Sequence, residues 1–113
     1  MLAKANRVTR PDDFRTIVRR GRRSSTALAV YYRVERDPAD PARFGFIVSR
    51  AVGGAVERNL LRRRMRAVGR QLVDSGAQGM DVVVRALPGS AQRGWASVSA
   101  DMHDELDSSL MGR

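Results

Sequence analysis

Apolar positions follow two different periods along the chain, and the clearest pattern lies between Gly53 and Leu72. Apolar residues recur there every three or four positions, at Leu61, Met65, Val68 and Leu72. At about 100° per residue these side chains fall on one narrow helical stripe, which is the spacing of a core-facing surface. The pattern predicts a helix that opens after Gly53-Gly54 and is stopped by the segment 74–79, rich in turn-forming residues.

Three other segments have the patterns of strands. From Ser24 to Glu35 apolar residues alternate, and Phe44 to Arg50 is a second candidate strand. Turn-forming residues separate the two, so we expect residues 24–50 to form an antiparallel pair. The β-branched run from Met80 to Ala86 predicts a buried strand.

Two more helices are expected. Thr9 offers a hydroxyl cap, Pro11 stands in the first turn and Gly21 ends the pattern, so the first helix should cover residues 11–20. The last helix is indicated by apolar residues at helical spacing, at Trp95, Val98, Met102, Leu106 and Leu110.

The order of these elements is α-β-β-α-β-α, with room for a short extra strand around residues 22–26. This order predicts an α+β fold, an α/β sandwich built on a single sheet. The chain has 113 residues, which fits one domain spanning 1–113.

The far side of the 53–72 helix is unusual because its charges share one sign. An ordinary surface helix mixes acids and bases at spacings of three and four, whereas like charges there destabilise by a few tenths of a kcal/mol per pair. A polyanionic partner would offset that cost. This side of the helix carries Arg58, Asn59, Arg62, Arg63, Arg66 and Arg70.

The totals point in the same direction. The net charge is +9 and Lys4 is the only lysine, so almost all of the positive charge is arginine, which suits phosphate and stacks on bases. There is no cysteine, no signal-peptide pattern and no apolar run of membrane-spanning length, so we expect a cytoplasmic protein without a membrane partner. We expect no metal site or catalytic group in the chain: His103 is isolated, and Asp101, Asp104 and Glu105 are interpreted as the solvated face of the last helix.

Four motifs occur in the order and with the gaps of a known family. They are Asp13-Phe14 with Gly21, the segment 44–50 ending in Ser49-Arg50, the segment 54–59 followed by Leu61-Arg62-Arg63 and Arg66, and the strand 81–86. Together they resemble the protein subunit of bacterial ribonuclease P, and the resemblance covers most of the chain.

The resemblance implies a four-stranded sheet with three helices in the order α-β-β-β-α-β-α, with a left-handed βαβ crossover. It implies binding to the catalytic RNA of ribonuclease P and to precursor tRNA, whose 5′ leader is removed by hydrolysis. The RNA and Mg²⁺ bound mainly to it would perform the chemistry; the protein would be inactive alone, would bind no metal and would need no other protein.

The resemblance also assigns residues. Contacts with the catalytic RNA fall to Ser49, Arg50, Arg58, Asn59, Arg62, Arg63, Arg66 and Arg70. A cleft for the leader is implied at Phe14, Val18, Val30 and Tyr32.

Two positions depart from the family pattern. Leu60 stands where an arginine is usual, and we expect Arg64 to supply the missing RNA contact. Val18 stands where an aromatic residue is common, so stacking would rest on Phe14 and Tyr32. The alternative functions are a general RNA-binding protein of ribosomal type and a stand-alone nuclease, and the scattered acids speak against the second.

Overall fold

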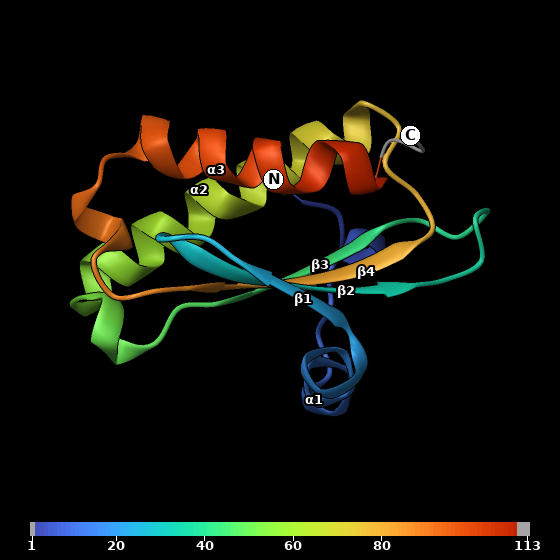
Figure 1. The fold of residues 1–113 in the computed structure, drawn as a ribbon, viewed down its shortest axis with the longest axis horizontal. Coiled ribbons are helices and arrows are strands. Elements are labelled where there is room, and N and C mark those ends of the chain that lie inside the picture. The colour runs from blue at the N-terminus through green and yellow to red at the C-terminus, as the bar shows by residue number, and fades with distance from the viewer. Residues whose placement is uncertain (1, 111–113) are drawn as a thin grey trace.

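One mixed β-sheet is covered by helices on both faces, as the computed structural model shows for residues 2–110 (Figure 1). Helices α2 and α3 lie on one face and α1 on the other. Side chains are described as far as Asp107. Met1 and residues 111–113, which belong to the predicted domain, lie outside the described residues. The elements are α1 (Pro11–Arg20), β1 (Arg22–Ser25), β2 (Ala29–Glu35), β3 (Arg43–Ile47), α2 (Ala55–Asp74), β4 (Met80–Ala86) and α3 (Trp95–Leu110).

The strand order is β1-β2-β4-β3, and it corrects one prediction. β2 and β3 do not pair: β2 is antiparallel to both β1 and β4, whereas β3 runs parallel to β4. The expected antiparallel pair over residues 24–50 was therefore wrong, and the hairpin is instead β1–β2. The physical reason is that β4 is buried from Met80 to Val84, so this strand belongs in the centre of the sheet.

The chain passes from β2 to β3 across the start of β4. The loop over residues 36–42 is held there by two backbone hydrogen bonds, from Arg36 N–H to Gly79 O and from Gly79 N–H to Asp40 O, both 2.8 Å. Helix α2 then joins the adjacent parallel strands β3 and β4. The left hand of that crossover stays a prediction.

Each face of the sheet has its own apolar core. Between the sheet and α2 with α3, the predicted stripe of Leu61, Met65, Val68 and Leu72 is buried, as expected. A smaller core lies between the sheet and α1, built on Val8, Ile17, Val30, Tyr32 and Val83. Among the described residues, no helix is long and apolar enough to cross a bilayer.

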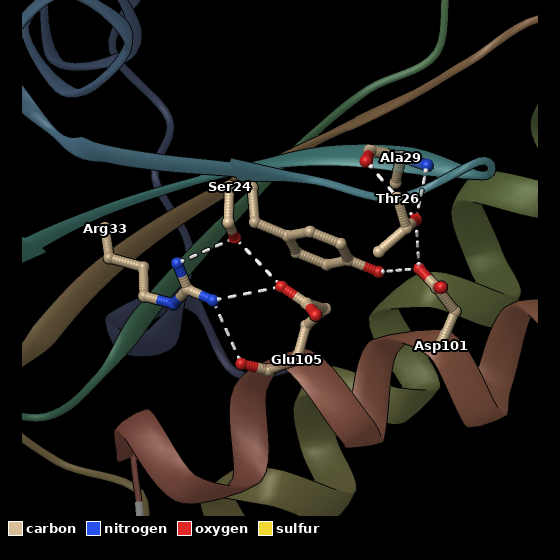
Figure 2. Close-up of polar contacts among 7 residues, drawn as sticks. Ser24, Thr26, Ala29, Arg33, Asp101 and Glu105 are labelled. Atoms are coloured by element: carbon tan, nitrogen blue, oxygen red, sulfur yellow. Dashed lines mark hydrogen bonds and ion pairs between the residues drawn. The ribbon is translucent and has the colours of Figure 1, made fainter.

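The acidic side of α3 faces the sheet at Asp101 and Glu105 (Figure 2), whereas Asp104 is exposed. Asp101 accepts hydrogen bonds from the hydroxyls of Tyr31 and Thr26, and Glu105 accepts one from Ser24 at 2.9 Å. Arg33 adds an ion pair with Glu105 at 3.5 Å. The prediction of a fully solvated acidic face was wrong for Asp101 and Glu105, because polar groups of β1 and β2 need partners where α3 crosses them.

Candidate nucleic-acid interface

A cationic groove runs between α2 and the N-terminal segment of the chain. Its volume is about 580 Å³. Four predicted residues of the helix line it, and the structure adds Leu2, Arg7 and Ala67 to them. The predicted residues in this α2 groove are Asn59, Arg62, Arg63 and Arg66.

Arg7 reaches the groove because the segment before α1 lies along the free edge of β3. Arg7 forms a parallel bridge with Phe44, and the side-chain amide of Asn6 donates a hydrogen bond of 2.8 Å to the carbonyl of Ala42. The Nε–H group of Arg7 is buried and has no acceptor in the described part of the chain. Arg7 could not be predicted from the sequence, because no periodicity indicates which strand edge this segment joins.

The guanidinium of Arg62 is oriented by hydrogen bonds to two acceptors, one on α2 and one just after β3. Its Nη1 donates to Asn59 Oδ1 at 2.9 Å and its Nη2 to the carbonyl of Val48 at 3.4 Å. These bonds fix the guanidinium at the end of β3 while several of its N–H groups stay available to a ligand. A planar fork held in this way can bind a phosphate with two parallel hydrogen bonds.

The other predicted α2-side residues surround this groove without lining it. Ser49 and Arg50 are exposed just after β3, where Ser49 precedes the 3-10 turn Arg50–Val52. Arg58 is half-buried in the first turns of α2. Arg70 forms an ion pair of 3.1 Å with Asp74 near the end of the helix.

Leu60 and Arg64 lie on a different side of α2. Both line a small hollow of about 70 Å³ with Trp95 of α3. The guanidinium carbon of Arg64 lies 5.9 Å from the centroid of the Trp95 ring, the geometry of a cation–π contact. Arg64 is therefore engaged outside the α2 groove, and Leu60 contributes an apolar wall at the α2–α3 contact.

A second groove, the α1 groove, has a volume of about 470 Å³ and lies between α1 and the end of β3. Its apolar floor comes from Phe14, Val18 and Ile47, and Arg15 and Arg19 border it. Val18 is 36% exposed, a large value for an apolar side chain. An apolar floor with cationic borders suits the bases and phosphates of a single strand.

Val30 and Tyr32 lie beneath α1. They are 2% and 5% exposed and belong to the core under that helix. The prediction that they line the surface of the cleft was wrong, because helix α1 covers them. This face of β2 is turned toward the smaller core. Their observed contribution is to support α1, and through it Phe14 and Val18.

Arginines line the α2 groove, whereas apolar side chains with arginines at the border form the second groove. In the described part of the chain, no three His, Cys, Asp or Glu side chains come together as a metal site would need. The α2 groove is lined by arginines without a carboxylate. A groove of this composition can neutralise and orient a polyanion.

Comparison with known proteins decides the family. The family model for Ribonuclease P matches residues 2–108. This chain belongs to the ribonuclease P protein family. Ribonuclease P protein components are similar to it over nearly their whole length: that of Clavibacter michiganensis is 47% identical over 102 residues, covering 90% of both chains. That of Streptomyces avermitilis is 42% identical over 120 residues, covering 99% of this chain and 98% of the other.

Solved ribonuclease P proteins have the same fold. The protein from Staphylococcus aureus aligns with a TM-score of 0.82, covering 94% of this chain and 96% of that one, at 24% identity. The protein from Thermotoga maritima aligns with a TM-score of 0.77, covering 88% of this chain and 94% of that one, also at 24% identity. The expected α+β fold, with three helices on a four-stranded sheet, is confirmed.

Proposed function

We propose that this chain is the protein subunit of ribonuclease P and assists removal of the 5′ leader from precursor tRNA. The observation that carries this proposal is the presence of two grooves of different chemistry, one beside α2 and one beside α1, the helices that cover opposite faces of the sheet. The α2 groove is lined by arginines, and the α1 groove has an apolar floor. Family membership makes the ribonuclease P RNA the first candidate for the arginine-lined surface.

In this proposal the α2 groove binds the ribonuclease P RNA. Arg62, Arg63 and Arg66 approach its phosphates, and Arg7 faces them from the opposite wall. The surface around the groove is extended by Ser49, Arg50, Arg58 and Arg70. Because Arg62 is held by Asn59 and Val48, it loses little conformational entropy when an RNA phosphate binds.

The α1 groove holds the leader of the precursor tRNA. Phe14 supplies a ring on which a base can stack, and Val18 and Ile47 extend the apolar floor. Val30 and Tyr32 act indirectly, because they set the height of α1 above the sheet. The protein would bind the leader on one face and the RNA subunit on another. It would thereby strengthen substrate binding without supplying a catalytic group.

The chemistry would remain with the RNA. In this proposal, Mg²⁺ bound to the RNA subunit would supply the activated water for phosphodiester hydrolysis. The protein would act by binding and orienting, and would need no further protein.

Reconstitution tests this proposal. The chain is combined with a bacterial ribonuclease P RNA, and leader removal from a precursor tRNA is measured at low Mg²⁺ with and without protein. We expect clear stimulation, which shrinks when the leader is trimmed to one nucleotide. Tight RNA binding without stimulation would instead identify a general RNA-binding protein, and cleavage by the protein alone would identify a nuclease.

A further inference from the structure

A second cluster of arginines surrounds the junction between α1 and β1. Helix α1 ends at Arg20 and β1 begins at Arg22, with Gly21 alone between them. The N–H of Gly21 donates to the carbonyl of Ile17 at 2.8 Å, so the junction continues the helix directly into the strand. The α1–β1 arginine cluster consists of Arg19, Arg20, Arg22 and Arg23, and all four are exposed.

The acids nearest to this cluster in sequence are engaged elsewhere. Asp12 pairs with Arg15 at the start of α1, and Asp13 lies 3.8 Å from Arg43. Among the described residues, none of the four cluster arginines forms an ion pair with a carboxylate. The helix C-terminus favours a cation at Arg19 and Arg20, and a charged edge strand resists aggregation. Neither effect requires four like charges in five residues, which repel one another.

The cluster is remote from the α2 groove. β1 and β3 are the opposite edges of the sheet, separated by three strand spacings or roughly 14 Å. The α2 groove lies beyond β3, and α1 and α2 cover opposite faces (Figure 1). This separation exceeds the Debye length of about 8 Å at physiological salt, so the charges of the two surfaces are largely screened from each other.

The cluster is continuous with the α1 groove. Arg19 borders that groove beside Val18 and is also the first member of the cluster. On β1, Arg23 pairs with Tyr32, whose side chain faces the core under α1, so Arg23 points toward the α1 side of the sheet. Arg22 pairs with Arg33 and points toward the α3 side. A single-stranded nucleic acid that leaves the α1 groove past Arg19 therefore meets the cationic side chains around the β1 edge of the sheet.

We propose that the α1–β1 arginine cluster binds the phosphates of leader nucleotides upstream of those in the α1 groove. This inference rests on the proposed function and deepens it: the leader site has an apolar part that stacks bases and a cationic part that holds the backbone. The cationic part is insensitive to sequence, because phosphates are the same at every nucleotide. It acts only on leaders long enough to pass Arg19.

Leader length provides the test. The holoenzyme is reconstituted with Arg22→Gln/Arg23→Gln protein, and its affinity is measured for precursor tRNAs with a one-nucleotide leader and with a leader of about a dozen nucleotides. We expect the variant to lose about 10-fold in affinity for the long leader, with a salt slope shallower by about 1.4, and to keep its affinity for the short one.

Two further variants isolate the effect. Lys4→Gln/Arg93→Gln removes two charges from exposed positions elsewhere and should leave the difference between long and short leaders unchanged. Arg22→Lys/Arg23→Lys keeps the charge and should retain most of the long-leader affinity. Thermal unfolding of each variant checks that the β1 edge still folds.

The outcomes separate the two proposals. Equal losses for both leaders would assign the cluster to the ribonuclease P RNA, and no loss for either would make it a solvated surface; each overturns the inference. If the wild-type protein fails to stimulate cleavage of either substrate, the proposed function fails first.

Discussion

The ring of Phe14 lies directly on the backbone of Gly45. A Cβ at Gly45 would stand 2.5 Å from Cε1 of Phe14 and 3.2 Å from Cβ of Val8. No side chain other than hydrogen fits between this ring and β3. The glycine therefore sets the depth at which Phe14 sits in the floor of the α1 groove.

Substituting Gly45→Ala should push the Phe14 ring outward, because the atoms in the way are the far end of a movable side chain. We expect a stability loss of about 1–2 kcal/mol from overpacking. Affinity for a leader-bearing precursor tRNA should fall, while assembly with the RNA subunit is unchanged. Urea unfolding and binding to substrates with and without a leader would measure the two effects.

A Phe14→Leu variant provides the comparison for Gly45→Ala, since it removes the ring without crowding the strand. Both variants should lose the same leader-dependent affinity. If Gly45→Ala weakened binding to substrates with and without a leader equally, the contact between ring and backbone would have no specific part in leader binding.

Substituting Gly69→Ala should have the opposite effect on stability. Gly69 lies inside α2, and a Cβ there would meet Leu2 and Phe44 at 3.5 Å, an ordinary van der Waals distance. Alanine is favoured over glycine within a helix by about 0.8–1 kcal/mol. We expect the free energy of unfolding to rise by up to that amount, with RNA binding unaltered, and a decrease would mean that Leu2 cannot adjust.

Reversing one charge in the α2 groove should weaken assembly with the ribonuclease P RNA and spare the fold. If the protein neutralises about 5–8 phosphates, the log–log salt slope of RNA binding is roughly −4 to −7. Arg66→Glu should make that slope shallower by about one unit, whereas Arg93→Glu, exposed outside the groove, should have less effect. A slope near zero for the wild type would contradict the phosphate-binding role of this groove.

Tyr31 should make stability depend on alkaline pH. Burial, together with its hydrogen bond to Asp101, raises the pKa of Tyr31 above its ordinary value. The unfolded chain loses this proton near pH 10 while the folded protein retains it, so the stabilisation is complete below pH 10. Above pH 10 the free energy of unfolding should fall by up to about 1.4 kcal/mol per pH unit.

The Tyr31→Phe variant isolates this ionisation from other alkaline effects. At neutral pH it should be about 1 kcal/mol less stable, because Asp101 loses one of its two hydroxyl partners. Its deficit relative to the wild type should shrink as the pH rises above 10. A constant deficit, measured by urea unfolding between neutral and strongly alkaline pH, would show that Tyr31 ionises equally in both states.

The sequence predicted the elements better than their pairing. The helical stripe ending at Leu72 and the apolar run of β4 each follow from a single local period, and both were located correctly. Strand order depends on which segments meet across long stretches of chain, which no local period encodes. The antiparallel pairing of β2 with β3 was wrong for that reason, although the three consecutive valines of β4 already indicated a buried strand.

The candidate site was predicted from the sequence to a similar extent. Arg62, Arg63 and Arg66 share a helix face, so their grouping follows from helical geometry. Arg7 joins them only through the edge of β3, and tertiary packing of this kind has no sequence period. The burial of Tyr32 was missed because alternation places it on a face of the sheet without telling what covers that face.

The central position of β4 also dictates an order of events during synthesis. β2 and β3 leave the ribosome before β4. Until β4 has been synthesised as far as residue 86, the backbone edges of β2 and β3 that will pair with it stay unpaired. Both apolar cores are incomplete until then. Val82 and Val84 belong to the core under α2 and α3, and Val83 belongs to the core under α1. The nascent chain can form the β1–β2 hairpin and the α2 helix early. The arginine face of α2 takes its fixed position beside β3 only when β4 has paired with both β2 and β3.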